Sequence, residues 1–168
     1  MKAISQSSAE FREGKAGQLV VFALDEQRYA LRLSAVEQIV RVVEITSLPK
    51  APEIILGVIN IHGRIVPVYN IRARFRLPVR EFSLSDHLIV ACTAKRAVAL
   101  VADRVEGVVA RTDEEVTEIQ DISPSLEYIE GVVKLEDGLV FIHDLGTFLS
   151  VEEEARLAEA LTPAQESP

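Results

Sequence analysis

The sequence has a single cysteine and no tryptophan among its 168 residues. One cysteine excludes an internal disulfide, and the setting HLIVACTA favours a small buried residue over a nucleophile at Cys92. No apolar run approaches the roughly 18 residues of a membrane span, and the opening segment MKAISQSSAEFREGKAG lacks the apolar stretch of a signal peptide. We therefore expect a cytoplasmic protein that reaches a membrane only through a partner.

Positive charge is also scarce, because 26 acidic residues outnumber 18 lysines and arginines and give a net charge of −8. Nucleic acid phosphates repel such a chain unless its basic residues gather in one place. With 48% hydrophobic and 26% charged residues, the composition is that of a soluble globular protein. A chain of this length folds without disulfides or metals, as one domain or two very small ones.

The apolar pattern from Gln18 onward is mostly that of β-strands. In GQLVVFALDEQRYALRL an apolar run is followed by a polar turn and then by alternation, which places Tyr29, Leu31 and Leu33 on one face. Two such segments around a turn predict a hairpin.

Two blocks of this sequence occur twice, in the same order. Leu19–Val40 aligns without gaps with Leu88–Val109, and Ile55–Ile71 aligns with Ile129–Leu145. Chance similarity between hairpins accounts for one such match but not for two in one order. The identical pairs are Leu19/Leu88, Val21/Val90, Ala30/Ala99, Leu31/Leu100, Val36/Val105, Glu37/Glu106, Val40/Val109, Gly57/Gly131, Val58/Val132 and Val66/Val140.

The repeat predicts two copies of a small barrel-like unit, at about 18–80 and 85–150. A unit of about 60 residues is marginally stable alone, so we expect the two to pack together and leave a groove at their junction. The polar stretch Leu77–Asp86 is predicted to link them, and strand exchange between the units is left open.

The two ends of the chain read differently. Residues 1–17 are expected to be a flexible segment. Ser150 and Glu153 form a capping-box pattern that starts a C-terminal helix at 151–161, with Val151, Ala155, Ala158 and Leu161 expected on one face. Thr162-Pro163 is expected to end that helix and leave 162–168 as a tail.

Catalytic and cofactor motifs are missing, since the sequence has no CxxC, HExxH, GxSxG, GxGxxG or GxxxxGK[ST] pattern. We expect no enzymatic activity, no cofactor and no metal. Zinc bound by His62, His143 and Asp144 is conceivable, but the repeat gives these residues no matched set of ligands.

The segment GVINIHGRIVPVYNIRARF, residues 57–75, predicts a hairpin that carries unusual residues for a strand pair. His62-Gly63 suits a two-residue turn, and Gly63 adopts a positive φ at no steric cost. Pro67 lacks an N–H donor, which restricts it to an edge, a bulge or a strand end. Asn60 and His62 share one face beside the turn, where ordinary solvent-facing residues would also be found.

This hairpin resembles the signature of the CheW family of chemotaxis coupling proteins, which typically reads G-x-x-N-x-R-G-x-x-x-P-V-x-D-L. The resemblance runs over nearly the whole chain, from GQLVVFALDEQRYALRLSAVEQIV to EGVVKLEDGLVFIHDLGTFLSVEEE. It implies an all-β fold of two SH3-like five-stranded β-barrels packed together, with a short C-terminal α-helix. It also implies a non-enzymatic scaffold that tethers a CheA-type histidine kinase, through its regulatory domain, to the cytoplasmic tip of chemoreceptors. Such a protein is a monomer alone and forms arrays with its partners.

Carried over by position, the resemblance implies a receptor-binding region near the barrel junction and leaves the kinase contacts unassigned. Three positions depart from the family pattern. His62 stands where the family usually has Arg, Asn70 replaces Asp, and VEQI places Gln38 where Glu is usual. The implied receptor-binding residues are Val36, Gln38, Gly57, Asn60, His62, Gly63, Ile65 and Val108.

Two other readings stay open. One is a small hydrolase that uses His62 or His143 in a cleft between the barrels, although no nucleophile stands out near either histidine. The other is an RNA-binding barrel protein that uses the basic stretch Arg72–Arg80 with Phe75 among its arginines. Given the overall charge, we expect that stretch to be a solvated face instead.

Overall fold

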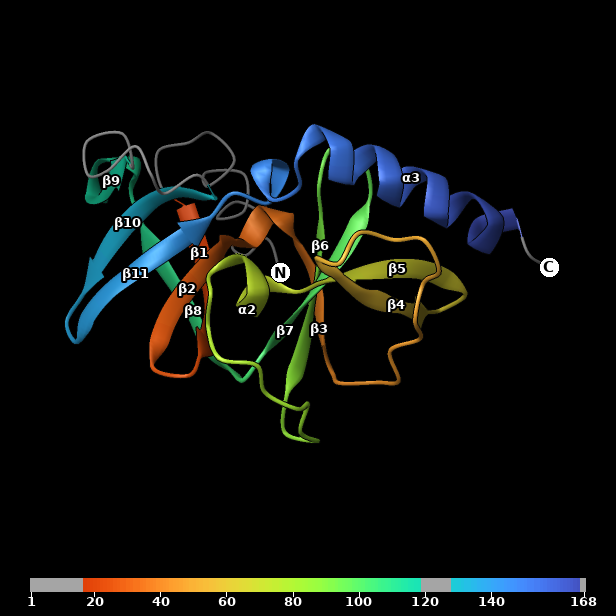
Figure 1. Ribbon diagram of the computed structural model, residues 1–168. Coiled ribbons are helices and arrows are strands. Elements are labelled where there is room, and N and C mark those ends of the chain that lie inside the picture. The colour runs from red at the N-terminus through yellow and green to blue at the C-terminus, as the bar shows by residue number, and fades with distance from the viewer. Residues whose placement is uncertain (1–16, 119–127, 167–168) are drawn as a thin grey trace, which may run out of the picture. The chain divides into compact units, whose positions relative to one another are not determined.

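The computed structural model describes residues 17–118 and 128–166, and the predicted flexible segment 1–17 lies outside the described residues except for Gly17. The described chain is mostly β-structure and ends in one longer helix (Figure 1). The all-β prediction is confirmed. The strands and helices are β1 (Gly17–Leu24), β2 (Gln27–Arg32), β3 (Val36–Arg41), β4 (Ile55–Ile61), β5 (Arg64–Tyr69), α2 (Ile71–Arg74), β6 (His87–Cys92), β7 (Ala97–Ala102), β8 (Arg104–Arg111), β9 (Val116–Glu118), β10 (Ile129–Leu135), β11 (Gly138–His143) and α3 (Val151–Glu166).

The chain divides into two compact units, each assembled from two separate stretches of sequence. Of the described residues, unit 1 comprises 17–36, 104–118 and 128–145, and unit 2 comprises 37–103 and 146–166. The compact units therefore differ from the sequence repeats at 18–80 and 85–150. The stretch Leu77–Asp86, expected to link two units, lies inside unit 2.

Unit 1 contains a six-stranded sheet in the order β8-β1-β2-β11-β10-β9. Figure 1 shows the orange β1 and β2, from the start of the chain, in one sheet with the blue β10 and β11 from near its end. Alternating apolar side chains of this sheet form one core, as expected for strands in which every second residue points to the same face. That core contains Leu19, Val21, Ala30, Val133, Val140 and Ile142.

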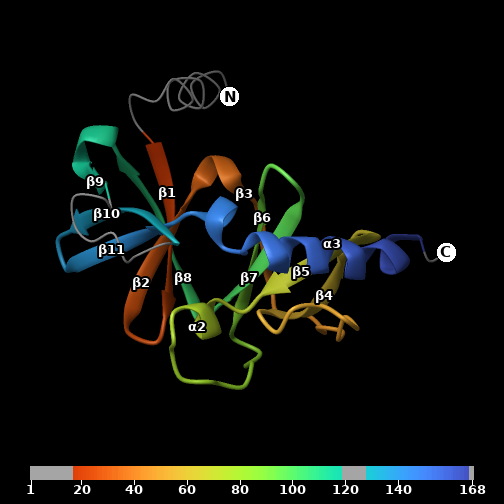
Figure 2. The ribbon, with the colours of Figure 1, turned by 45° about the horizontal axis from the view of Figure 1, so that its top comes forward.

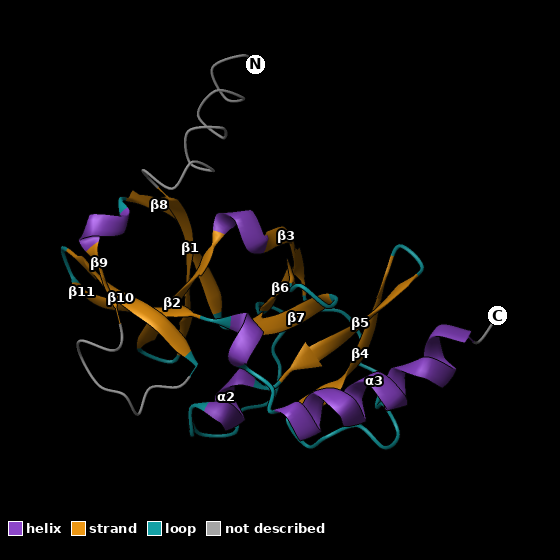
Figure 3. Cartoon of the chain, turned by 90° about the horizontal axis from the view of Figure 1, so that it is seen from above, coloured by secondary structure: helices purple, strands orange, loops and turns teal. Residues whose placement is uncertain are grey.

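Unit 2 contains a five-stranded sheet in the order β3-β6-β7-β5-β4, and α3 runs along the β4–β5 hairpin (Figures 2 and 3). Valines and isoleucines dominate its core, in keeping with the β-branched residues that pack well on a pleated surface. The core residues are Ile59, Ile61, Val66, Val68, Leu88, Val90, Ala99 and Val101.

The two sheets repeat one pairing scheme with strands exchanged between the sequence copies. Val68 of the first copy pairs in parallel with Ala99 of the second, while Ile142 of the second pairs in parallel with Ala30 of the first. These residues occupy equivalent repeat positions. Each sheet therefore combines the first hairpin of one copy with the second hairpin of the other. The two sheets have six and five strands where the prediction gave five and five.

The C-terminal helix starts as predicted but ends later. Ser150 N–H donates to Glu153 Oε1 at 2.8 Å and Glu153 N–H donates to Ser150 Oγ at 3.0 Å, which completes the capping box. The predicted end at 161 is wrong, because α3 continues to Glu166. A proline in the last turn removes one backbone donor, and here that loss does not end the helix.

The predicted apolar face of this helix is also wrong in part. Val151 is 90% exposed, whereas Leu157 is fully buried and Ala160 and Leu161 are nearly so. The first turn of the helix is tied to α2 by the ion pair Arg74–Glu153, of 2.6 Å, and to the turn before β7 by Arg96–Glu154, of 2.5 Å. The buried positions Leu157, Ala160 and Leu161 have the i, i+3, i+4 spacing of one helix face.

Candidate functional site

The tip of the β4–β5 hairpin is a tight turn held by one side chain. His62 and Gly63 both have positive φ, 51° and 84°, the backbone of a two-residue turn that matches strand twist. Asn60 Oδ1 accepts a hydrogen bond of 2.7 Å from the Gly63 N–H. Asn60 thus shapes the turn, while His62 is exposed at its apex.

Pro67 lies where β5 loses one of its neighbours. It pairs with Val58 of β4, but the parallel pairing of β5 with β7 begins only at Val68. The missing N–H of Pro67 therefore breaks no ladder between β5 and β7, which agrees with the edge among the three predicted settings, although Pro67 lies inside β5.

Gly57 has a structural reason to be glycine. Its φ is +153°, and a Cβ at this position would overlap the carbonyl oxygen of Thr46. Thr46 forms two backbone hydrogen bonds with the neighbouring Val58, of 2.7 and 2.9 Å. Gly57 allows this close approach, so the segment around Thr46 can hydrogen-bond to β4 of the hairpin.

A polar cluster that the sequence reading missed joins three strands of unit 2. Arg64, the first residue of β5, donates a hydrogen bond to Glu37 of β3, and the Cys92 thiol donates to the other carboxylate oxygen of Glu37 at 3.2 Å. The hydrogen bond from Arg64 lowers the pKa of Glu37, and the hydrogen bond to Glu37 raises the pKa of Cys92. Cys92 is exposed, so the prediction of a buried core residue is wrong. It shares a strand face with the core residues Leu88 and Val90 but is the last residue of β6, where the packed core ends.

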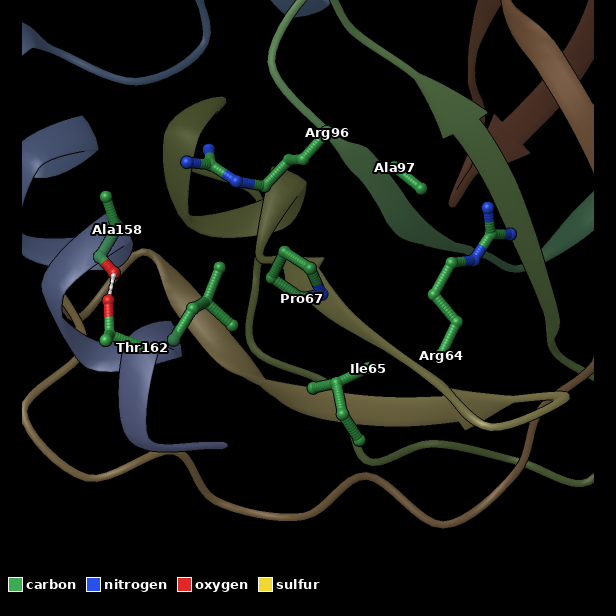
Figure 4. A pocket seen from close by; sticks show the side chains of 8 residues that line it. Arg64, Ile65, Pro67, Arg96, Ala97, Ala158 and Thr162 are labelled. Atoms are coloured by element: carbon green, nitrogen blue, oxygen red, sulfur yellow. Dashed lines mark hydrogen bonds between the residues drawn. The ribbon is translucent and has the colours of Figure 1, made fainter. Parts of the chain in front are cut away.

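A groove with a cavity volume of about 430 Å³ lies between α3 and the β4–β5 hairpin (Figure 4). Figure 4 shows Pro67 in the middle, with Ala158 and Thr162 of α3 on one side and Arg64 on the other. The groove is lined by Arg64, Ile65, Pro67, Arg96, Ala97, Ala158, Leu161 and Thr162. All of these residues belong to unit 2.

The predicted receptor-binding residues fall into both units. Val36 and Val108 belong to unit 1, where Val108 is 50% exposed on β8 and pairs with Val20 of β1. The other members belong to unit 2: half-buried Gln38 on β3, and Gly57, Asn60, His62, Gly63 and Ile65 of the hairpin segment. The hairpin members are brought together by the turn, and the membership of Val36, Gln38 and Val108 in one site stays a prediction.

The hydrolase reading finds little support in the two histidines. His143 is 3% exposed and packs against the rings of Phe22 and Tyr29, with centroid distances of 5.8 and 5.1 Å. Burial lowers the pKa of His143 to about 3. His62 is exposed on a turn of the other unit. Among the described residues, no group of three or more His, Cys, Asp or Glu side chains could hold a metal ion.

The arginine stretch of the RNA-binding reading is largely engaged in ion pairs. Arg72 donates two hydrogen bonds to Asp103, of 2.8 and 2.9 Å, and Arg80 bridges Asp103 and the buried Asp86. Arg74 pairs with Glu153 of α3. The expected solvated face is therefore wrong for these arginines, since each of them is paired with a carboxylate.

Asn70, one of the family departures, caps α2. Its Oδ1 accepts from the Ala73 N–H at 3.1 Å. Asn and Asp are about equally good at this position, so the exchange preserves the local structure while removing a negative charge. Within the described parts of the chain, no helix is both long and apolar enough to cross a membrane.

The two sheets with exchanged hairpins and the exposed β4–β5 turn define the class of small β-protein to which this chain belongs. Residues 18–153 match the model of the CheW-like domain, and the chain belongs to this family. Chemotaxis protein CheW of Rhizobium meliloti is 29% identical over 138 residues, which cover 81% of this chain and 89% of that protein. Chemotaxis protein CheW of Thermotoga maritima is 29% identical over 146 residues, covering 86% and 91%.

A solved structure shares the fold. The crystal structure of the scaffolding protein TtCheW from Thermoanaerobacter tengcongensis superimposes with a TM-score of 0.74 and 28% identity, over 82% of this chain and 94% of that one. A solved protein that shares this fold is thus described as a scaffolding protein.

Proposed function

We propose that this protein is a non-enzymatic scaffold that couples a CheA-type histidine kinase to chemoreceptors in a chemosensory array. The match of a CheW-like domain over residues 18–153 carries the proposal. Relatives that cover most of the chain are named chemotaxis proteins, and a solved relative is named a scaffolding protein. The kinase would be bound through its regulatory domain, and the receptor at its cytoplasmic tip.

The receptor contact is assigned to the β4–β5 hairpin. Asn60 and Gly63 fix the turn, so the side chains on the following strand have one orientation. Half-buried Ile65 supplies apolar area, and exposed His62 is a polar neighbour for specificity. An imidazole lacks the planar fork of hydrogen-bond donors and the permanent charge of the family's usual arginine, so this position would alter receptor preference.

The protein is proposed to work in the cytoplasm as a monomer that joins membrane-associated receptors through its partners. A single contact of micromolar strength, about −8 kcal/mol, suffices when many copies act together in one assembly. No catalytic residue is assigned, because a scaffold raises the local concentration of its partners without making or breaking bonds.

The test is co-sedimentation of the wild-type chain and the kinase with receptor-containing membranes, followed by measurement of kinase autophosphorylation. Ile65→Asp should abolish receptor-dependent activation while leaving the far-UV circular dichroism spectrum unchanged. Leu139→Asp is the matched control, because Leu139 is the repeat equivalent of Ile65 and is 53% exposed on β11. Full activation by Ile65→Asp would remove the hairpin assignment, and a wild-type chain that recruits no kinase would remove the scaffold function.

A further inference from the structure

One face of β5 is packed against the α3 segment at one end of the strand and borders the open groove of unit 2 at the other end. At one end of β5, Tyr69 stacks on Phe148, which precedes α3, with ring centroids 4.6 Å apart. At the other end Ile65 is only half-buried and borders the open groove. The same strand is thus sealed near Tyr69 and open near Ile65.

The walls of the groove are apolar, and its charges are already neutralised. Ile65, Pro67, Ala97 and Leu161 contribute carbon surface from the sheet and from the helix. The two arginines at its rim have partners, since Arg64 pairs with Glu37 and Arg96 pairs with Glu154. An occupant is therefore selected by apolar area and shape and gains little from carrying charge.

The hydroxyl of Thr162 offers no free donor to the groove. Its Oγ1 donates to the carbonyl oxygen of Ala158 at 3.0 Å, one turn back along α3 (Figure 4). The small side chain of Ala158 leaves the space open. A volume of about 430 Å³ accommodates a pair of large apolar side chains, as on one face of an amphipathic helix.

We propose that α3 completes the receptor-docking surface: the groove between Ala158–Thr162 and Ile65 receives an apolar pair of side chains from a helix of the chemoreceptor tip. This inference rests on the proposed function and extends it to the C-terminal helix. The receptor is the partner, in preference to the kinase, because the groove is continuous with the hairpin residue Ile65 already assigned to the receptor.

The experiment places one glutamate in the groove and one outside it. Ala158 and Ala155 are both exposed alanines of α3, but only Ala158 lines the groove. Ala158→Glu and Ala155→Glu therefore carry the same chemical change and the same helix-propensity cost. Thr162→Arg is a second blocking variant. Each full-length variant is titrated with a cytoplasmic fragment of a chemoreceptor from the same organism and, separately, with the regulatory domain of its kinase.

We expect Ala158→Glu and Thr162→Arg to weaken binding of the receptor fragment at least tenfold, with Ala155→Glu within twofold of wild type. Binding of the kinase domain should stay within twofold for all three. Receptor affinity unchanged in Ala158→Glu would overturn the groove assignment while leaving the scaffold function standing, as would equal losses in Ala158→Glu and Ala155→Glu. Weakened binding of the kinase domain alone would assign the groove to the kinase and overturn the proposal. A wild-type chain that binds neither fragment would remove the proposed function itself.

Discussion

Tyr69 and Phe148 stack face to face, with an interplanar angle of 6° between rings whose centroids are 4.6 Å apart. Arg74 lies over the Phe148 ring, with its guanidinium carbon 5.2 Å from the ring centroid. Phe148 is fully buried, so it anchors the segment before α3 to β5. The position of α3, and with it the groove, depends on this anchor.

The first prediction concerns this anchor. Phe148→Ala should lower the free energy of unfolding by about 3–5 kcal/mol, because it removes a buried ring and leaves a cavity. The measurement is urea denaturation followed by circular dichroism. Val151→Ala, three residues on and 90% exposed, should change stability by less than about 0.5 kcal/mol. A loss below about 1 kcal/mol for Phe148→Ala would contradict the anchoring role.

The second prediction separates two glycines of one hairpin segment. Gly63→Ala meets open space and should cost about 1–2 kcal/mol, the strain of a left-handed backbone. Gly57→Ala carries a similar backbone cost and also forces its Cβ against the Thr46 carbonyl, so it should lower the melting temperature more than Gly63→Ala does. Thermal unfolding of the two variants side by side tests this order, and equal melting temperatures would refute it.

The third prediction concerns thiol chemistry. The hydrogen bond to Glu37 raises the pKa of Cys92, so this exposed thiol should react with iodoacetamide more slowly at pH 8 than an ordinary exposed cysteine. Glu37→Gln removes the negative charge beside the thiol and leaves Arg64 nearby, so the pKa of Cys92 should be lower in the variant. Because each unit of pKa changes the thiolate fraction about tenfold, alkylation of the variant should be several-fold faster. An unchanged rate would show that Glu37 does not control Cys92.

The fourth prediction is a pH dependence of stability that arises from His143. Its pKa is about 3 in the folded protein, against about 6.5 in the unfolded chain, so the unfolded state binds the extra proton as the pH falls. The contribution of His143 to the free energy of unfolding is therefore present above pH 6.5, and about 2 kcal/mol of it is lost between pH 7 and pH 5. His143→Phe, which keeps a ring beside Phe22 and Tyr29, should remove this part of the loss. Denaturation of both proteins at pH 7 and pH 5 gives the difference, and parallel losses would contradict the prediction.

Local patterns predicted the hairpins and their turns well. The turn at His62–Gly63 and the capping box of Ser150 depend on neighbours a few residues away, so their chemistry is visible in the sequence. The predicted inward face of α3 is wrong in part, because contacts with residues far away in sequence, such as Arg74 and Arg96, decide which side of the helix packs. The prediction for Cys92 fails for a related reason, since its apolar neighbours give no sign that it lies at the end of the strand, beyond the packed core.

The candidate site was only partly visible in the sequence. The hairpin residues Asn60, Gly63 and Ile65 were identified from a motif, because they are contiguous. Glu37 and the α3 residues that border the same hairpin were missed, since ion pairing and groove formation join segments that no local pattern connects. The arginines from Arg72 to Arg80 were read as a solvated face because their carboxylate partners, Asp103 and Glu153, come from other elements.

By itself, the sequence determined that this protein is a duplicated β-protein of the CheW-like family, since turn residues, alternation and repeat identities are properties of short stretches. Only the tertiary structure decided that each sheet takes its hairpins from different copies, as Val68 with Ala99 and Ile142 with Ala30 demonstrate. The reason is physical. The two copies present nearly equivalent strand edges, so local chemistry permits pairing within or between copies, and the choice depends on how the whole chain packs.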